Sequence, residues 1–244
     1  MEAQTANRPD DWPAGTKILV ILAHPDDPEF FLGGSIARWC AEGHEVHYAI
    51  LTDGSRGVSE AYPEPEALSK VRDAEQRAAA DTLGVKTITW FGYSDGFLVP
   101  DLDVRRRVVR FIREMQPDIV VSCDPTNYYG SGPYLNHPDH RAAGQIVVDS
   151  IYPAVGNPSY FPELMEEGIM PHQVSELWLS LTANPNTELD VSPHWERRLE
   201  ALECHSSQIG ERVAFVERMQ QRRIDLGDPD GRYIERFRRI IFRR

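Results

Sequence analysis

Two short clusters of histidine and aspartate carry the chemistry that this chain of 244 residues can do. They are His24-Pro25-Asp26-Asp27 and His137-Pro138-Asp139-His140. His24 and Asp27 can grip one divalent metal ion from a tight turn, and His140 can supply a third ligand. Three protein ligands with an open position are typical of catalytic zinc, whereas structural zinc usually has four protein ligands. The clusters therefore predict a metal site that activates water.

The remaining polar side chains of the two clusters are candidates for acid–base work. Zinc lowers the pKa of bound water from about 15.7 to about 7, and Asp26 sits beside the ligand Asp27, where it can take the proton. His137 can stabilise an oxyanion as imidazolium or protonate a leaving amine. Asp139 is expected to orient an imidazole rather than to bind metal. The plainer interpretation is that the aspartates cap loops and that His137 is a helix N-cap.

Composition excludes several classes of protein. A formal charge of −12 argues against a general nucleic-acid binder, which would usually show a basic face. No apolar run approaches the roughly 18–20 residues of a membrane span, and the N-terminus has no secretory signal pattern. The three cysteines are scattered, which favours a reducing compartment over a disulfide framework. We therefore expect a cytoplasmic protein without nucleic-acid or membrane partners.

The elements that must position the clusters alternate along the chain. A polar segment over residues 1–15 is expected to be a flexible lead-in to a single domain over residues 16–244. Apolar runs predict strands at 17–23, 45–51, 85–91, 118–123, 175–181 and 188–191. Amphipathic or capped segments predict helices at 36–42, 66–83, 103–115, 138–151 and 194–205. The last third is charged and reads as helical, and the basic tail at 236–244 is expected to be a helix packed on the body or on a neighbouring subunit.

Strands that alternate with helices indicate βαβ units and a mostly parallel, Rossmann-like α/β sheet flanked by helices, with a C-terminal elaboration. In the strand order 3-2-1-4 the first and fourth strands are neighbours. The crevice beyond their carboxyl ends is the point where ligands bind in such sheets. Because the two clusters follow these two strands, the topology predicts that they form one joint site.

Four further side chains are weaker candidates for substrate binding. Asp53 and Asp95 follow the second and third strands, but each precedes a glycine, and Asp-Gly is ordinary turn chemistry. Arg72 can belong to a solvated helix face. His205, in His205-Ser206-Ser207-Gln208, is expected to approach the site from the C-terminal side.

Taken together, these motifs resemble the LmbE/PIG-L-type zinc-dependent de-N-acetylases. The resemblance rests on the two clusters, on Thr52-Asp53-Gly54, on the helix from Arg72 to Gly84 and on His205 to Gln208. It implies a Rossmann-like fold, a zinc cofactor and removal of an N-acyl group from an amino sugar or its conjugate, in a protein that can form homo-oligomers. By position it implies His24, Asp27 and His140 as ligands, Asp26 as general base, His137 as the electrophilic or acid partner, and Asp139 as the residue that tunes His137. Members of the family often have an acidic residue directly after the first motif, whereas here Pro28 precedes Glu29.

The sequence thus predicts a metal-dependent N-deacetylase that acts on a small-molecule N-acyl amino sugar. Two alternatives stay open at this point. Two histidines and one carboxylate also form the Fe(II) site of non-haem oxidoreductases, so Fe²⁺ could replace Zn²⁺. A non-catalytic binding protein could also have kept a metal for structure.

Overall fold

A seven-stranded mixed sheet forms the centre of the protein. We describe it from a computed structural model, which defines residues 8–57, 60–129, 135–226 and 231–242. The strand order is β3-β2-β1-β4-β5-β7-β6, and β1 to β5 run parallel while β7 is antiparallel to both of its neighbours. The strands are β1 Lys17–Leu22, β2 Glu45–Thr52, β3 Thr87–Tyr93, β4 Ile119–Cys123, β5 Glu176–Ser180, β6 Thr187–Asp190 and β7 Ile234–Ile241.

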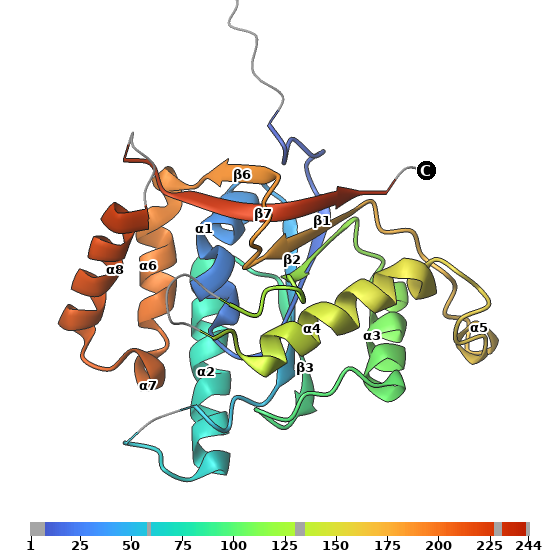
Figure 1. Ribbon diagram of the computed structural model, residues 1–244, viewed down its shortest axis with the longest axis horizontal. Helices are drawn as coiled ribbons and strands as arrows, with labels where there is room; N and C mark the ends of the chain where they lie inside the picture. The colour runs from blue at the N-terminus through green and yellow to red at the C-terminus, as the bar shows by residue number, and fades with distance from the viewer. Residues whose placement is uncertain (1–7, 58–59, 130–134, 227–230, 243–244) are drawn as a thin grey trace, which may run out of the picture.

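Helices cover both faces of this sheet (Figure 1). They are α1 Asp27–Ala41, α2 Pro65–Leu83, α3 Leu102–Met115, α4 Pro138–Asp149, α5 Glu163–Glu166, α6 Trp195–Glu203, α7 Ser206–Ile209 and α8 Arg212–Leu226, with a π-helical turn at Ser150–Val155 and a 3-10 turn at Ser192–His194. In Figure 1, α6 and α8 stack outside α1 and α2, whereas α3 and α4 lie on the other side of the strands.

Alternation along the strands builds two cores. In β1, Leu19 and Ile21 pack under α3 and α4, whereas Ile18, Val20 and Leu22 pack under α1 and α2. A strand whose two faces are both buried needs apolar residues at every position, which is why β1 reads as an unbroken apolar run. The α/β fold and the 3-2-1-4 strand order predicted from the sequence are confirmed.

Two of the predicted elements are wrong. The first helix begins at Asp27 and not at Ile36, so Asp27 is its first residue and the two glycines lie inside it. The basic tail is strand β7 rather than a helix. Glu235 and Phe237 are buried, whereas Arg236 and Arg238 are exposed, so burial alternates with the period of a strand.

The expected flexible lead-in also differs from the structure. Residues 1–7 lie outside the described residues, but residues 8–15 pack onto the domain. Asp10 is fully buried and accepts hydrogen bonds from Arg38 and Trp39, and the Trp12 ring stacks edge-on against Trp178. Among the described residues, no helix is long and apolar enough to cross a membrane.

Candidate metal centre and active site

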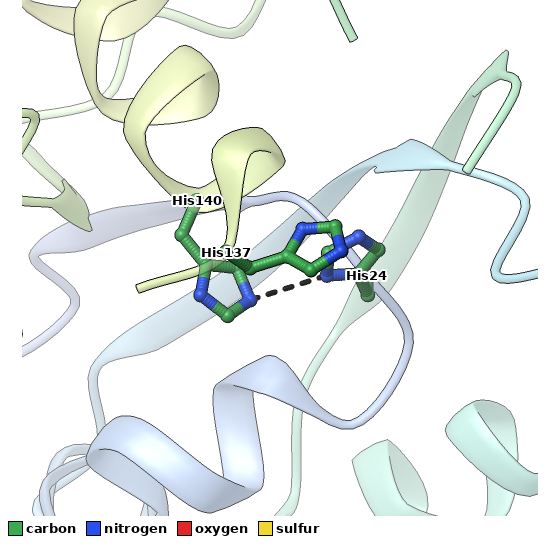
Figure 2. Close-up of side chains that lie close together, drawn as sticks. All are labelled: His24, His137 and His140. Atoms are coloured by element: carbon green, nitrogen blue, oxygen red, sulfur yellow. Dashed lines mark hydrogen bonds between the residues drawn. The ribbon is translucent and has the colours of Figure 1, made fainter. Parts of the chain in front are cut away.

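The two clusters meet at the carboxyl edge of the sheet, as the topology predicts. His24 follows β1, and His137 and His140 stand at the start of α4, which follows β4 (Figure 2). Strands β1 and β4 are hydrogen-bonded neighbours. Parallel neighbours end at the same edge, so residues that lie far apart in the sequence share one site.

Three potential ligands converge at short distances. His24 Nδ1 lies 3.2 Å from His140 Nε2, the contact drawn in Figure 2. The Asp27 carboxylate lies 3.1 Å from His140 Nε2 through Oδ1 and 3.5 Å from His24 Nδ1 through Oδ2. Ligands bonded at about 2.0–2.1 Å to a tetrahedral ion are about 3.3 Å apart. The spacing of these atoms therefore fits a zinc-sized cation.

The protons of the two imidazoles are drawn away from this convergence point. His24 Nε2 lies 3.1 Å from Asp95 Oδ1 and 3.2 Å from Asp139 Oδ2, and His140 Nδ1 lies 3.0 Å from Asn136 Oδ1. Each of these oxygens is an acceptor for a ring N–H. The opposite nitrogens, His24 Nδ1 and His140 Nε2, then face one another with lone pairs. Two lone pairs and a carboxylate repel unless a cation lies between them, so the arrangement fits a metal.

The carboxylates around His24 favour a positive charge at this point. Burial opposes charge on His24, but Asp27, Asp139 and Asp95 together raise the pKa of His24 well above its usual value. The same pairing lowers the pKa of Asp27 against its own burial, because both His140 and His24 favour the carboxylate. The site therefore selects positive charge.

Other groupings of donor atoms are less suited to a metal. Ring nitrogens of His24, His137 and His140 lie within 4.8 Å of one another, as do donor atoms of His24, Asp95 and Asp139. In the second grouping, Asp95 and Asp139 contact His24 Nε2, the ring nitrogen that faces away from the convergence point. Carboxylates in this position orient a ligand histidine. In the first grouping, the His137 ring stands edge-on to His24 with centroids 4.7 Å apart, and no carboxylate is included.

Asp26 lies beside the convergence point in an unusual conformation. Its φ is +86°, the left-handed region, which costs of order 1–3 kcal/mol for a residue other than glycine. Arg72 Nη2 donates to Asp26 Oδ2 at 3.1 Å and to the Pro25 carbonyl at 2.6 Å. Burial raises the pKa of Asp26 to about 6, while the Arg72 charge lowers it. A carboxylate with such a pKa is suited to accept a proton near neutral pH.

His137 is both the N-cap of α4 and a member of the site. Its Nδ1 accepts a hydrogen bond from the Asp139 backbone N–H at 3.2 Å. Burial, with the charges of His24 and His140, lowers the pKa of His137. The neutral ring must then carry its proton on Nε2, so His137 can donate a hydrogen bond from that nitrogen. The lowered pKa favours a neutral donor over the imidazolium, and the role of His137 stays a prediction.

Asp139 contacts a different histidine from the one expected. The family resemblance implies that it tunes His137, but its Oδ2 lies 3.2 Å from His24 Nε2 and also accepts from Gly96 N–H at 2.7 Å. The Leu98 N–H donates to its other oxygen at 3.2 Å. Asp139 therefore orients the candidate ligand His24. The loop after β3, which supplies the Gly96 and Leu98 N–H groups, holds the Asp139 carboxylate in place.

A cavity of about 810 Å³ opens over these groups. Of the four weaker candidates, it contains Arg72 and Asp95 and not Asp53 or His205. Asp53 instead accepts the backbone N–H groups of Ser55 and Asp95, which is the turn role that was its alternative. His205 is fully buried and lies 3.1 Å from Glu29 through Nε2.

Several lining residues were missed by the sequence analysis. They come from the loops after β2, β4 and β5, from the N-terminal part of α1 and from α7, and they are Phe30, Phe31, Arg56, Gly57, Asn127, Asn136, Leu181, Thr182 and Gln208. Only Gln208, in the motif that begins at His205, had a sequence signal. The loop residues lie in irregular segments whose spatial position no local pattern fixes.

The fold and site together define a three-layer α/β protein with a candidate histidine–carboxylate metal site at the carboxyl edge of its sheet. The family model described as PIG-L, GlcNAc-PI de-N-acetylase, matches residues 19–151, and the chain belongs to this family of metal-dependent enzymes. This confirms the family predicted from the sequence, and neither an oxidoreductase nor a non-catalytic binder is favoured.

Individual relatives agree with this assignment. A diacetylchitobiose deacetylase from Thermococcus kodakarensis is 35% identical over 197 residues, which are 81% of this chain and 72% of the relative. A probable N-acetyl-alpha-D-glucosaminyl L-malate deacetylase 2 from Bacillus anthracis is 26% identical over 82% of this chain and 85% of the relative. The solved structure of the N,N'-diacetylchitobiose deacetylase from Pyrococcus horikoshii, in complex with its inhibitor MPG, superposes with a TM-score of 0.83 at 31% identity, covering 93% of this chain and 84% of that one.

Proposed function

We propose that this protein hydrolyses the N-acetyl group of an amino sugar or its conjugate, with His24, Asp27 and His140 holding Zn²⁺. The observation that carries the proposal is the convergence of two ring nitrogens and one carboxylate within 3.1–3.5 Å, beside the spare acid Asp26. Bound zinc would supply Lewis acidity toward the amide carbonyl and would acidify a water molecule.

The chain's own side chains account for the proton movements. Asp26, which keeps 16% of its side chain exposed in the cavity, accepts a proton from the attacking water. His137 donates from Nε2 to the oxygen that becomes negative when the carbonyl carbon turns tetrahedral. The protonated Asp26 then gives its proton to the departing amine, so that acetate and a free amino sugar leave and Asp26 regains its charge.

The cavity also supplies groups that can position a sugar. Arg72 and Asp95 both line it, and Arg72 Nη1 lies 3.8 Å from Asp95 Oδ2. A donor and an acceptor side by side suit vicinal hydroxyl groups, so these two residues are proposed to bind the sugar ring. The ligand is a small molecule, and assembly into homo-oligomers stays a prediction.

Amine release tests the proposal directly. Protein purified without added metal is analysed for metal content, stripped with a chelator and reloaded with Zn²⁺ or Fe²⁺. Each form is then assayed for acetate and free amine on N-acetylglucosamine, diacetylchitobiose and acidic N-acetylglucosaminyl conjugates. We expect stoichiometric acetate and amine with zinc. The absence of both products from every substrate, with one zinc bound, would contradict the assignment.

A further inference from the structure

One peptide unit, between Pro25 and Asp26, is held at both ends by a single helix. Arg72 Nη2 donates to its carbonyl oxygen at 2.6 Å, and Gln76 Oε1 accepts from its N–H, on Asp26, at 2.7 Å. Arg72 and Gln76 are four residues apart in α2, so their side chains lie on the same face of that helix. Opposite ends of one peptide plane are therefore fixed by neighbouring side chains.

The orientation of this plane sets the conformation of Asp26. The left-handed φ of +86° is a rotation of Asp26 about its own N–Cα bond relative to that peptide. A flip of the plane would exchange the carbonyl and N–H positions and would move Asp26 toward the negative φ that residues other than glycine prefer. Arg72 has only donors to offer the carbonyl, so a flipped peptide would present an N–H to a cation.

Glu29 determines which way round the Gln76 amide lies. Both of its carboxylate oxygens accept from Gln76 Nε2, each at 3.1 Å. Because a carboxylate only accepts, the amide nitrogen must face Glu29 and the amide oxygen must face the Asp26 N–H. Glu29 is itself anchored at 3.1 Å by Tyr48 and by His205.

These groups form a fully buried support beneath the active site. The side chains of Glu29, Gln76, Tyr48 and His205 are fully buried and do not line the cavity. They come from α1, α2, β2 and the residue before α7. The support includes Glu29, whose role the intervening Pro28 had left open, and His205, which is fully buried and is not among the residues that line the cavity.

From this geometry we propose that Gln76 is a positioning residue for Asp26. Oriented by Glu29, it completes with Arg72 a clamp on the Pro25–Asp26 peptide and holds the Asp26 carboxylate at the reacting water. This inference rests on the proposed function, because it gives the clamp a purpose only if Asp26 transfers protons. Gln76 contacts neither substrate nor metal and acts through Asp26 alone.

The test is a double-mutant cycle between Gln76→Met and Asp26→Asn. Methionine nearly conserves the shape of glutamine but removes all three hydrogen bonds of Gln76. In zinc-loaded Gln76→Met we expect kcat to fall about 10- to 100-fold, the range for a misplaced group, with KM within about twofold and one zinc bound. In the Asp26→Asn background Gln76→Met should change kcat by less than about twofold, because residues that act as one unit are not additive. Arg77→Met, which removes an exposed partner of Asp73 and of the Trp90 ring from the same helix, is the matched control for stability.

The outcomes separate the two proposals. Wild-type-like kcat in Gln76→Met, or the same fold loss in both backgrounds, overturns the clamp while leaving Asp26 as the base. Loss of zinc in Gln76→Met in proportion to activity also overturns it. Unchanged kcat in Asp26→Asn overturns Asp26 as the base, and the clamp falls with it, whereas only the absence of acetate and amine from every substrate overturns the proposed function.

A reciprocal exchange tests the role of Glu29. Gln76→Glu alone places two carboxylates in contact and should lose activity. Adding Glu29→Gln restores one donor amide and one carboxylate between the two positions, so kcat should recover toward the wild-type value. A double variant no more active than Gln76→Glu would show that Glu29 does not orient residue 76.

Discussion

Replacing Asp26 with asparagine should separate proton transfer from metal binding. Asparagine matches aspartate in size, and its amide oxygen can still accept from Arg72 Nη2, which lies 3.1 Å from Oδ2 in the wild type. Asp26 is not one of the three candidate zinc ligands, so the variant should still bind one zinc ion per chain. What the variant loses is proton acceptance, which contributes about 10²–10⁴ in rate. We therefore expect kcat to fall by that factor, or about 2.7–5.4 kcal/mol in activation free energy at 1.36 kcal/mol per decade.

The pH profile gives an independent check on Asp26. Burial raises its pKa to about 6 in the metal-free chain, and Arg72 opposes this. A cation bound beside Asp26 favours the carboxylate and lowers the pKa further, so the acid limb of kcat/KM in the zinc enzyme should lie at or below about pH 6. Activity should be lost as pH falls through this limb, because the base becomes protonated. Acetate release by a zinc-loaded Asp26→Asn variant at the wild-type rate, or with the wild-type acid limb, would refute the reasoning.

Three further changes test other parts of the structure. His140→Ala should weaken zinc binding by more than about 100-fold and abolish activity with it, since direct ligands matter more than outer residues worth 10–100-fold; tight one-to-one zinc in this variant, measured by elemental analysis, would point to a different ligand. Arg72→Met removes the charge that lowers the Asp26 pKa, so the acid limb of kcat/KM should move to higher pH, and an unmoved limb would contradict the assigned coupling. Gly144→Ala places a methyl group against the Cys123 carbonyl, and overpacking of about 1–3 kcal/mol should outweigh the roughly 1 kcal/mol gained in helix propensity; calorimetry should show a lower Tm, whereas an unchanged Tm would mean that α4 shifts freely.

Much of the fold was accessible from the sequence because its signals are local. A strand buried on both faces, such as β1, must be apolar throughout, and helices that follow such strands produce a parallel sheet. The basic tail was misread because its apolar residues Ile234, Phe237 and Ile240 recur every three positions, whereas burial in β7 alternates every second position. The start of α1 was misplaced because Asp26 adopts a positive φ that no local rule assigns to aspartate in this position.

The sequence by itself determined the chemical kinds of group at the site and, through strand order, that the two clusters meet. These follow from residue type and from topology, which short-range patterns encode. Only the tertiary structure decided which group serves which. The Asp139 carboxylate contacts His24, His205 contacts Glu29, and Gln76 accepts a hydrogen bond from the Asp26 N–H. Such pairings depend on distances of about 3 Å between residues far apart in the chain, and the packing of several helices and loops sets them together.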